Sequence, residues 1–316
     1  MSDISTLSKE FGFKDYEVIQ TFEGGNSLVF QIRSENQLFA IKKYVGDESR
    51  KIRSLFYEKE ALLFLNSNKL INCPELIAAS SKIPAIAYKW IEGSIINESD
   101  SVKSAIFSTI SKLAQPEHVK NYQIRAIDSV LNSAELIQQL KLRLKEFASV
   151  ENFPEELLRE LQDTFSNIQN LLNNEIEFNN KTLSLSDYGP HNLIRTDSGV
   201  FHHIDFEFFG VDSMAKMYSD LYCHPKTIFS GKEIRELMEI NHMSNSENTG
   251  VFKILPAIAL KWALIVLRRH VDWSASKFKL NESKYANPWD FLSYSKYLYK
   301  NINSDQTLTF NEFVSH

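Results

Sequence analysis

The sequence is poor in several features that mark particular classes of protein. Its two cysteines, Cys73 and Cys223, show no CxxC spacing and no Cys/His cluster, which argues against a disulfide framework and against a zinc site. Positive charge is not in excess, because the net charge is -5 at pH 7, and this argues against nucleic acid as the main partner. The most apolar run, residues 254–267, is too short to span a bilayer and contains Lys261. The first residues lack the basic-then-apolar layout of a signal peptide, so we expect a cytoplasmic protein with neither nucleic acid nor membrane as partner.

Glycine is also scarce. The 316 residues include ten, about half of the roughly 7% share that is usual in proteins. The few positions that carry glycine therefore indicate where the backbone needs it. Two adjacent glycines lie in TFEGGNSLVF, and single ones end YKWIEG, interrupt SDYGPHN and follow DFEFF. All of these stretches contain or adjoin the motifs analysed below.

The hydrophobic pattern changes near residue 93. Alternation of apolar and polar residues predicts strands over residues 16–22, 28–33, 37–44 and 83–91, with a helix over 54–65. Spacing of three and four residues then predicts helices over residues 133–147, 155–172, 231–243 and 257–270. We therefore predict an α+β protein with a small antiparallel-sheet lobe at residues 1–93, a hinge near its end, and a larger, mainly helical lobe at 94–316.

Lys42 lies in the third predicted strand, on the same face as Ala40. The small Ala40 leaves room for a flat ring, with the ammonium of Lys42 beyond it to reach phosphates. Taken alone, the AIK motif favours a simpler interpretation, in which Lys42 and Lys43 are solvated lysines at a strand end.

Glu58 favours the functional interpretation of Lys42. It lies on the apolar face of the predicted helix, between Leu55 and Leu62, where an unpaired carboxylate would be costly. A buried lysine on the neighbouring strand would satisfy it. The alternative is a surface charge on an imperfectly amphipathic helix, and Glu60 competes for the role of lysine partner.

Residues 183–210, LSLSDYGPHNLIRTDSGVFHHIDFEFFG, place Asp187, Asn192 and Asp205 among apolar residues. A predicted strand delivers Asp187 into a loop, and a turn near residue 198 returns the chain so that Asp205 comes close to Asn192. Oxygen ligands from Asp and Asn are what Mg²⁺ prefers, with nucleotide phosphates and water completing its octahedron. Asp187 could then face an acceptor hydroxyl as base or orienter, because phosphoryl transfer needs positioning, charge neutralisation and in-line attack.

Over roughly residues 15–270, the order of the motifs resembles that of the aminoglycoside phosphotransferase and choline-kinase-like family. These motifs are GGNS, AIK, Glu58, YKWIEG, SDxxxxN and IDFE. The resemblance implies the two-lobed protein-kinase fold and Mg²⁺-dependent transfer of the γ-phosphate of ATP or GTP to a hydroxyl of a small molecule. It implies that Lys42 holds the α- and β-phosphates and pairs with Glu58. It also implies that Asp187 is the catalytic aspartate and that Asn192 and Asp205 bind Mg²⁺.

The same resemblance implies further contacts with the nucleotide. The residues expected to make them are Gly24, Gly25, Asn26, Ser27, Ala40, Lys89 and Ile91. The first four form a hairpin tip that would cover the phosphates through backbone N–H groups. Lys89 and Ile91, in the hinge, would offer backbone groups to adenine.

One position departs from the family pattern. The family usually carries the motif HGD, and here Leu185 and Ser186 precede Asp187. In kinase-like folds that histidine is mainly architectural, so an apolar replacement is compatible with activity. A nucleotide-binding scaffold without turnover is the alternative, and retention of the lysine, its glutamate, both aspartates and the asparagine favours an active enzyme.

A protein Ser/Thr kinase is a further alternative. Such kinases need a long segment after the metal-binding aspartate to build a peptide platform. Here Asp220, which resembles the family aspartate that binds the catalytic-loop backbone, follows Asp205 by only fifteen positions, and no APE motif is present. Residues 94–180 instead form a helical insertion of the kind that walls the acceptor pocket in small-molecule kinases.

The composition of residues 268–284 bears on which acceptor is expected. This stretch carries five basic residues, two acidic residues, Trp273 and Phe278. This composition suits an anionic or sugar-like acceptor and fits poorly with a polycationic aminoglycoside. The simpler alternative is a helix end whose basic residues offset its dipole. The stretches SDYGPHN and IDFEFFGVDSMAKMYSDLYCHP also resemble a subgroup associated with surface-polysaccharide gene neighbourhoods, which implies a sugar or sugar-like acceptor.

The remaining polar residues of this region are expected to be structural. Asp212 is expected to cap the helix that follows it. Cys223 and His224 are adjacent but lack a catalytic constellation, so both are expected to be core residues.

Overall fold

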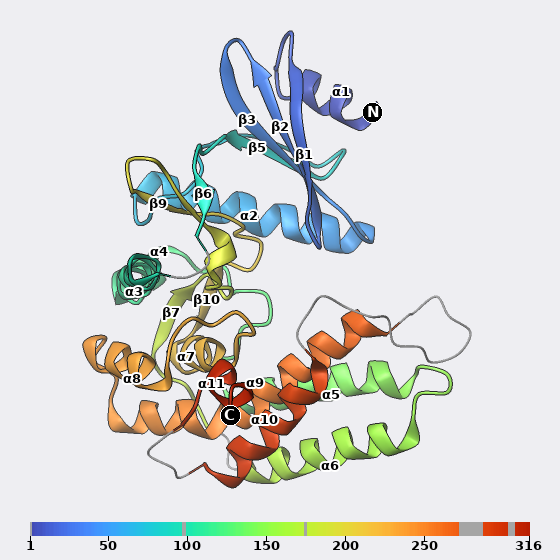
Figure 1. Ribbon diagram of the computed structural model, residues 1–316, viewed down its shortest axis with the longest axis vertical. Helices are drawn as coiled ribbons and strands as arrows, with labels where there is room; N and C mark the ends of the chain where they lie inside the picture. Colours follow the sequence, from blue (N-terminus) through green and yellow to red (C-terminus); the bar gives the residue numbers. More distant parts are fainter. Residues whose placement is uncertain (1, 97–98, 174–175, 272–286, 303–306) are drawn as a thin grey trace. The chain divides into compact units, whose positions relative to one another are not determined.

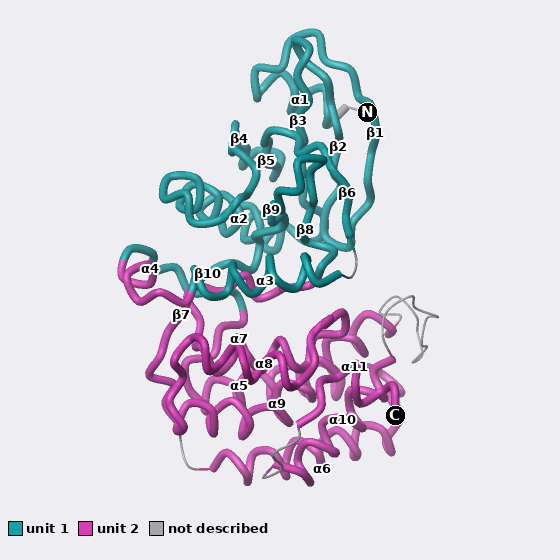
Figure 2. Tube along the Cα trace, turned by 60° about the vertical axis from the view of Figure 1, so that its left-hand side comes forward, with its two compact units in different colours: residues 1–113, 121–127, 190–210 teal, residues 114–120, 128–189, 211–316 magenta. Residues whose placement is uncertain are grey.

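The computed structural model describes residues 2–96, 99–173, 176–271, 287–302 and 307–316. The chain forms two compact units, which Figure 2 colours separately. Unit 1 comprises residues 1–113, 121–127 and 190–210, and unit 2 comprises residues 114–120, 128–189 and 211–316. The boundary predicted after residue 93 differs from this division, because helix α3 (Asp100–Leu113) and the segment 190–210 belong to the same compact unit as residues 1–93.

Unit 1 is built on an antiparallel five-stranded sheet of order β1-β2-β3-β5-β4 (Figure 1). Its strands are β1 (Glu17–Glu23), β2 (Ser27–Ser34), β3 (Gln37–Tyr44), β4 (Leu76–Ser80) and β5 (Ala85–Lys89). A second sheet of order β6-β8-β9 contains β6 (Ser94–Ile95), β8 (Leu193–Arg195) and β9 (Phe201–His203). The helices of this unit are α1 (Ser2–Glu10), α2 (Glu48–Asn68), α3 and the 3-10 turn η1 (Pro190–Asn192).

The alternation of side chains along β3 places a different helix on each face of the large sheet. Ile41 packs in a buried cluster with Ile4 and Leu7 of α1. The next residue, Lys42, contacts Glu58 of α2. Because successive strand residues point to opposite faces, α1 covers one face and α2 lies against the other.

Unit 2 is mainly helical. Its helices are α4 (Pro116–Asn121), α5 (Ser133–Ala148), α6 (Glu155–Leu171), α7 (Met214–Cys223), α8 (Gly231–Ile240), α9 (Asn245–His270), α10 (Pro288–Lys300) and α11 (Phe310–Val314). Strands β7 (Lys181–Ser184) and β10 (Gly210–Ser213) pair as a two-stranded sheet. The helices predicted over 133–147, 155–172, 231–243 and 257–270 correspond to α5, α6, α8 and α9.

Helix α9 is the core element of unit 2 and packs against α5, α6, α7 and α10. By length and composition it could cross a membrane, with a mean hydropathy of 1.9 in its most apolar window. However, 78% of that window is buried inside the fold, and the helix also buries the side chain of Lys261. We therefore interpret α9 as a core helix of unit 2.

Candidate functional site

Lys42 is the centre of the candidate nucleotide site in unit 1. Its Nζ lies 2.6 Å from Glu58 Oε2 and 2.7 Å from Asp205 Oδ1. These three residues come from β3, from α2 and from the segment that follows β9. Glu60 instead pairs with Lys59 at 3.3 Å, so the lysine partner is Glu58. The structure therefore brings together three residues that the sequence singled out.

The neighbouring carboxylates keep Lys42 ionised in spite of its burial. Burial by itself would lower the pKa of Lys42, but the carboxylates of Asp205 and Glu58 outweigh it and hold this pKa well above its ordinary value. Burial raises the pKa of Glu58, and the neighbouring Lys42 opposes that rise. Tyr44 donates its hydroxyl to Glu58 Oε2 at 2.8 Å. The ammonium group of Lys42 is therefore held in place on the face of the sheet that α2 lies against. A fixed positive charge of this kind is suited to bind phosphate oxygens.

Asn192 and Asp205 are joined by the hairpin that β8 and β9 form. Leu193 pairs with His203, and the N–H of Ile204 donates to the carbonyl of Asn192 at 2.9 Å. Asn192 is buried, whereas the Asp205 side chain is 41% exposed and its backbone has a left-handed φ of 66°. An amide oxygen and an accessible carboxylate at adjacent positions fit the oxygen ligands that Mg²⁺ prefers. Across the described ranges no cluster of three or more His, Cys, Asp or Glu side chains is assembled for a metal, so a bound ion would need phosphate and water oxygens as well.

Glu207 is a site residue that the sequence analysis missed. Glu207 is only 2% exposed, and its Oε1 accepts a hydrogen bond from Asn26 Nδ2 at 2.7 Å. Its Oε2 is buried and has no hydrogen-bond partner among the described residues. A buried carboxylate oxygen without a partner is costly, and such an atom indicates where a cation or a donor is to be bound. The signal in the sequence is the IDFE motif, in which a carboxylate follows Asp205 by two positions.

The glycine-bearing tip between β1 and β2 is held by both backbone and side-chain hydrogen bonds. Gly24 donates its N–H to Ser27 O at 2.9 Å, and Val45 donates to Asn26 O at 2.9 Å. The Asn26 side chain bridges two groups, because it donates to Glu207 and accepts from Arg50 Nη2 of α2. Asn26 therefore connects the tip to the segment that carries Asp205. The backbone contacts expected from Gly24, Gly25, Asn26 and Ser27 to phosphates stay a prediction.

The region expected to bind the base lies on β3 and β5. Ala40 is fully buried and pairs with Tyr88, while the rings of Phe22 and Trp90 stack with centroids 5.7 Å apart. The N–H of Lys89 donates to Glu75 O at 3.0 Å, so this group serves to hold β5 to β4. The hydrogen bonds expected from the backbone groups of Lys89 and Ile91 to adenine stay a prediction.

The hinge residues also line a pocket of about 790 Å³ on unit 1. Its walls include Arg33, Cys73, Lys89, Ile91 and His202. Lys42 and Asp205 do not line it, so we do not assign it to the phosphates.

Asp187 belongs to unit 2, where β7 leads into its loop. Its Oδ1 accepts a hydrogen bond from the N–H of Gly189 at 3.0 Å and lies 3.1 Å from His224 Nε2. The Asp187 side chain is 35% exposed, and Leu185, at the position of the family histidine, is buried. The expectation that His224 is simply a core residue is incomplete, because its ring is buried and also contacts the predicted catalytic aspartate. No sequence signal joined the two, because α7 lies between them along the chain.

Asp212 and Asp220 belong to a buried charge cluster beside α7. Lys216 forms ion pairs with Asp220 and, at 3.7 Å, with Asp212. Asp212 accepts hydrogen bonds from the N–H groups of Val130 and Ser213, and burial raises its pKa to about 6. The expectation that Asp212 caps α7 is wrong. The cap is Ser213, whose hydroxyl accepts the N–H of Lys216 at 3.1 Å.

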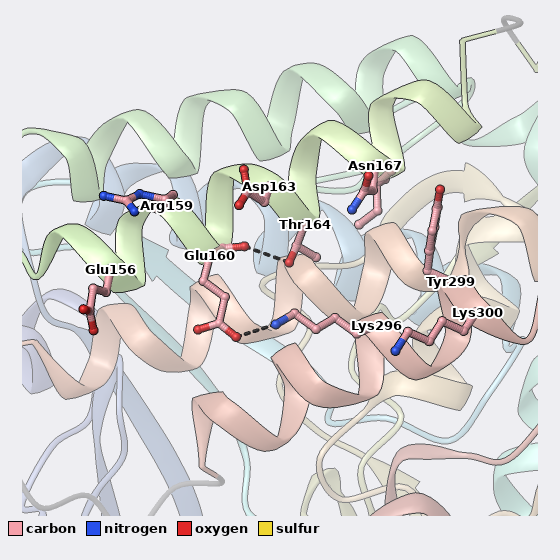
Figure 3. A pocket seen from close by; sticks show the side chains of 10 residues that line it. Glu156, Arg159, Glu160, Asp163, Thr164, Asn167, Lys296, Tyr299 and Lys300 are labelled. Carbon is pink, nitrogen blue, oxygen red and sulfur yellow. Dashed lines mark hydrogen bonds and ion pairs between the residues drawn. The ribbon is translucent and has the colours of Figure 1, made fainter.

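The groove between α6 and α10 in unit 2 has a volume of about 390 Å³ (Figure 3). An ion pair between Lys296 and Glu160 joins the two helices across it. The charged side chains on the α6 wall are mostly acidic and those on the α10 wall are lysines, and none of the predicted site residues lies there. Of the basic stretch 268–284, only residues 268–271 are described, and the remainder lies outside the described residues. Arg268 within it pairs with Glu146 at 3.2 Å.

No protein-family model matches the sequence, and no curated protein matches it. Solved structures do match. Choline kinase LicA from Streptococcus pneumoniae has a TM-score of 0.63 at 13% identity, covering 94% of this chain and 97% of that chain. A choline/ethanolamine kinase family protein from Mesorhizobium loti has a TM-score of 0.59 at 13% identity, covering 99% and 98%. Spectinomycin phosphotransferase in complex with ADP and spectinomycin has a TM-score of 0.56 at 13% identity, covering 96% and 97%.

These structures share the protein-kinase-like fold of aminoglycoside phosphotransferases and choline kinases. The described chain has this fold, so the predicted α+β class, with an antiparallel-sheet unit and a mainly helical unit, is confirmed. At these identities the likeness establishes the fold alone. Activity has to be argued from the site, because one fold hosts many functions.

Proposed function

We propose that this protein is a Mg²⁺-dependent kinase that transfers the γ-phosphate of ATP or GTP to a hydroxyl group of a small molecule. The observation that carries the proposal is the pair of contacts that Lys42 makes with Glu58 and Asp205. A buried lysine held between one buried carboxylate and one accessible carboxylate is a costly arrangement for stability alone. It is well suited to hold a phosphate group beside a metal ion.

Each residue of unit 1 has a distinct role in this proposal. Lys42 binds the α- and β-phosphates, and Glu58 fixes the position of its ammonium group. Asn192 and Asp205 hold Mg²⁺, and the buried Oε2 of Glu207, for which the described part of the chain offers no hydrogen-bond partner, supports a cation at this place. The ion, when bound, supplies neutralisation of the phosphate charge. Gly24 and the rest of the hairpin tip cover the phosphates.

Asp187 of unit 2 is proposed to orient the acceptor hydroxyl and to take its proton. Its carboxylate is partly exposed, and its Oδ1 accepts a hydrogen bond from the N–H of Gly189 and lies 3.1 Å from His224 Nε2. The new bond forms between the acceptor oxygen and the γ-phosphorus, and the bond to the β-γ bridging oxygen breaks. ADP or GDP leaves with that oxygen, and the acceptor proton passes to Asp187.

The acceptor is proposed to be a sugar or a sugar-like polyol linked to surface polysaccharide, and the protein is proposed to act in the cytoplasm. The basic and aromatic composition of residues 268–284 supports an anionic or neutral hydroxylated acceptor. It does not support a polycationic aminoglycoside, which would need a strongly acidic pocket.

The test is a screen of hydroxylated small molecules for stimulated ADP release with Mg·ATP and with Mg·GTP, followed by phosphorus NMR on any product. The panel contains acidic and neutral sugars, polyols, choline and aminoglycosides, and the Asp187→Ala variant is the control. We expect sugars or polyols to stimulate release by the wild type only. Nucleotide binding with no transfer to any acceptor would indicate a scaffold, and phosphorylation of aminoglycosides alone would overturn the acceptor class.

A further inference from the structure

His224 is held in a fixed orientation at the end of α7. Its backbone N–H donates to Asp220 O at 2.7 Å, which closes the last turn of the helix. Its ring meets Trp262 of α9 edge to face, with centroids 5.2 Å apart and planes at 85°. The side chain is only 7% exposed. A ring packed in this way has little freedom to turn.

The hydrogen bonds of the ring define which nitrogen carries the proton. Nδ1 accepts the backbone N–H of Lys226 at 3.0 Å, so it offers a lone pair in that direction. In a neutral imidazole the proton is then on Nε2. Nε2 lies 3.1 Å from Asp187 Oδ1, so a donor faces a carboxylate oxygen.

Asp187 Oδ1 receives this donor and a second one. The N–H of Gly189 donates to the same oxygen at 3.0 Å. Rotation of the carboxylate about its Cβ–Cγ bond would break both hydrogen bonds at once. The two donors therefore fix the plane of the carboxylate, and they come from different parts of the chain, the loop itself and the end of α7.

We propose that His224 is a positioning residue for Asp187, an inference that rests on the proposed kinase function. Leu185, two residues before Asp187, has a buried apolar side chain and can offer the loop no side-chain hydrogen bond. An imidazole reaches the Asp187 carboxylate from the end of α7. His224 acts through Asp187 and holds it in the orientation in which it accepts the proton of the acceptor hydroxyl.

The kinetic test compares two substitutions of His224 with one control. His224→Gln keeps an N–H donor near the place of Nε2, whereas His224→Leu removes the donor and keeps an apolar side chain. Tyr222→Phe is the matched control, because it removes the buried hydroxyl of Tyr222 from the same end of α7, and with it the hydrogen bonds to Gly231 O at 3.0 Å and to Arg235. The measurement is kcat and KM for ADP release, with Mg·ATP and the best acceptor of the screen.

We expect His224→Leu to lower kcat by about 10- to 100-fold, because it removes only the positioning of a general base that itself contributes about 10²- to 10⁴-fold, with KM for ATP changed less than about twofold. His224→Gln should recover most of kcat, and Tyr222→Phe should keep kcat within about threefold. An unchanged kcat in His224→Leu would overturn the proposal. Equal losses in both His224 variants and in Tyr222→Phe would also overturn it, because they would indicate packing alone.

A second measurement needs no turnover. Long-range proton–nitrogen NMR of the histidine rings, with the His224 signals assigned by their loss in His224→Gln, reports the tautomer in the wild type. We expect the Nε2–H form for His224, and a shift of its Nε2 signals in Asp187→Asn. The Nδ1–H form, or rings that do not respond to Asp187→Asn, would overturn the contact. If the contact is present and the wild type transfers phosphate to no acceptor, the kinase function fails and the positioning role fails with it.

Discussion

Replacing Lys42 by alanine should destabilise the protein by leaving Glu58 buried without its cation. Glu58 is only 1% exposed, so its carboxylate cannot hydrate when the lysine is removed. Breaking a buried pair by deleting one partner costs about 3–5 kcal/mol. Tyr44 still donates its hydroxyl to Glu58, which places the expected loss near the lower end, about 3 kcal/mol. Asp205 contributes little to the loss, because its accessible carboxylate can bind water instead.

The loss should depend on pH in a defined direction. Burial raises the pKa of Glu58, and removing Lys42 removes the charge that opposes this rise. An acid whose folded-state pKa is raised above its unfolded value favours the folded state at low pH, and this advantage disappears as pH rises through the folded pKa. Relative to the wild type, Lys42→Ala should therefore be less destabilised at pH 5 than at pH 8.

Urea unfolding followed by circular dichroism would measure both effects. The control is the double variant Lys42→Met with Glu58→Gln, in which neither charge is buried, and it should be less destabilised than Lys42→Ala. A loss below about 1 kcal/mol would refute the assignment of a buried pair, since removing one partner of such a pair costs at least about 3 kcal/mol. Equal losses at pH 5 and pH 8 would show that Glu58 is not the group left uncompensated.

Three further predictions concern activity. Asp187→Ala should abolish phosphate transfer and leave the affinity for Mg·ATP nearly unchanged, whereas Asp205→Ala should weaken Mg·ATP binding. Normal Mg·ATP binding by Asp205→Ala in calorimetry would contradict the metal assignment. Glu58→Ala should raise KM for the nucleotide while Glu60→Ala stays silent in the same steady-state assay, because only Glu58 contacts Lys42. Glu207→Gln should raise the Mg²⁺ concentration needed for half-maximal nucleotide binding in a titration, and an unchanged requirement would show that its carboxylate has no part in binding the ion.

The parts of the site that the sequence revealed are those governed by short-range periodicity. Alternation along β3 placed Lys42 on one face, and helical spacing placed Glu58 on the buried side of α2. The Asp205 position followed from a hairpin whose strands are close in sequence. Each of these inferences depends on residues fewer than about twenty positions apart, where the regular geometry of one element determines which side chains share a face.

The features that escaped prediction depend on packing between distant segments. Helix α1 presents only two apolar side chains, Ile4 and Leu7, to the sheet core, too few for periodicity to reveal it. The contact of His224 with Asp187 depends on how α7 packs beside the loop that carries Asp187. Asp212 was mistaken for the cap because both it and Ser213 have capping side chains, and only the backbone geometry distinguishes them.

The order in which Lys42 acquires its two partners has a consequence for synthesis of the chain. Glu58 follows Lys42 by 16 positions, whereas Asp205 follows it by 163. The segment 190–210 completes unit 1 only after the whole stretch from residue 128 to 189, which belongs to unit 2, has been made. At about 5–20 residues per second, a ribosome needs roughly 5–20 s to pass from residue 113 to residue 210. During that interval the nascent sheet can bury Lys42 against Glu58 and still lacks the residues proposed to hold the metal. The proposed function therefore predicts that the growing chain binds Mg·ATP only after most of it has been translated.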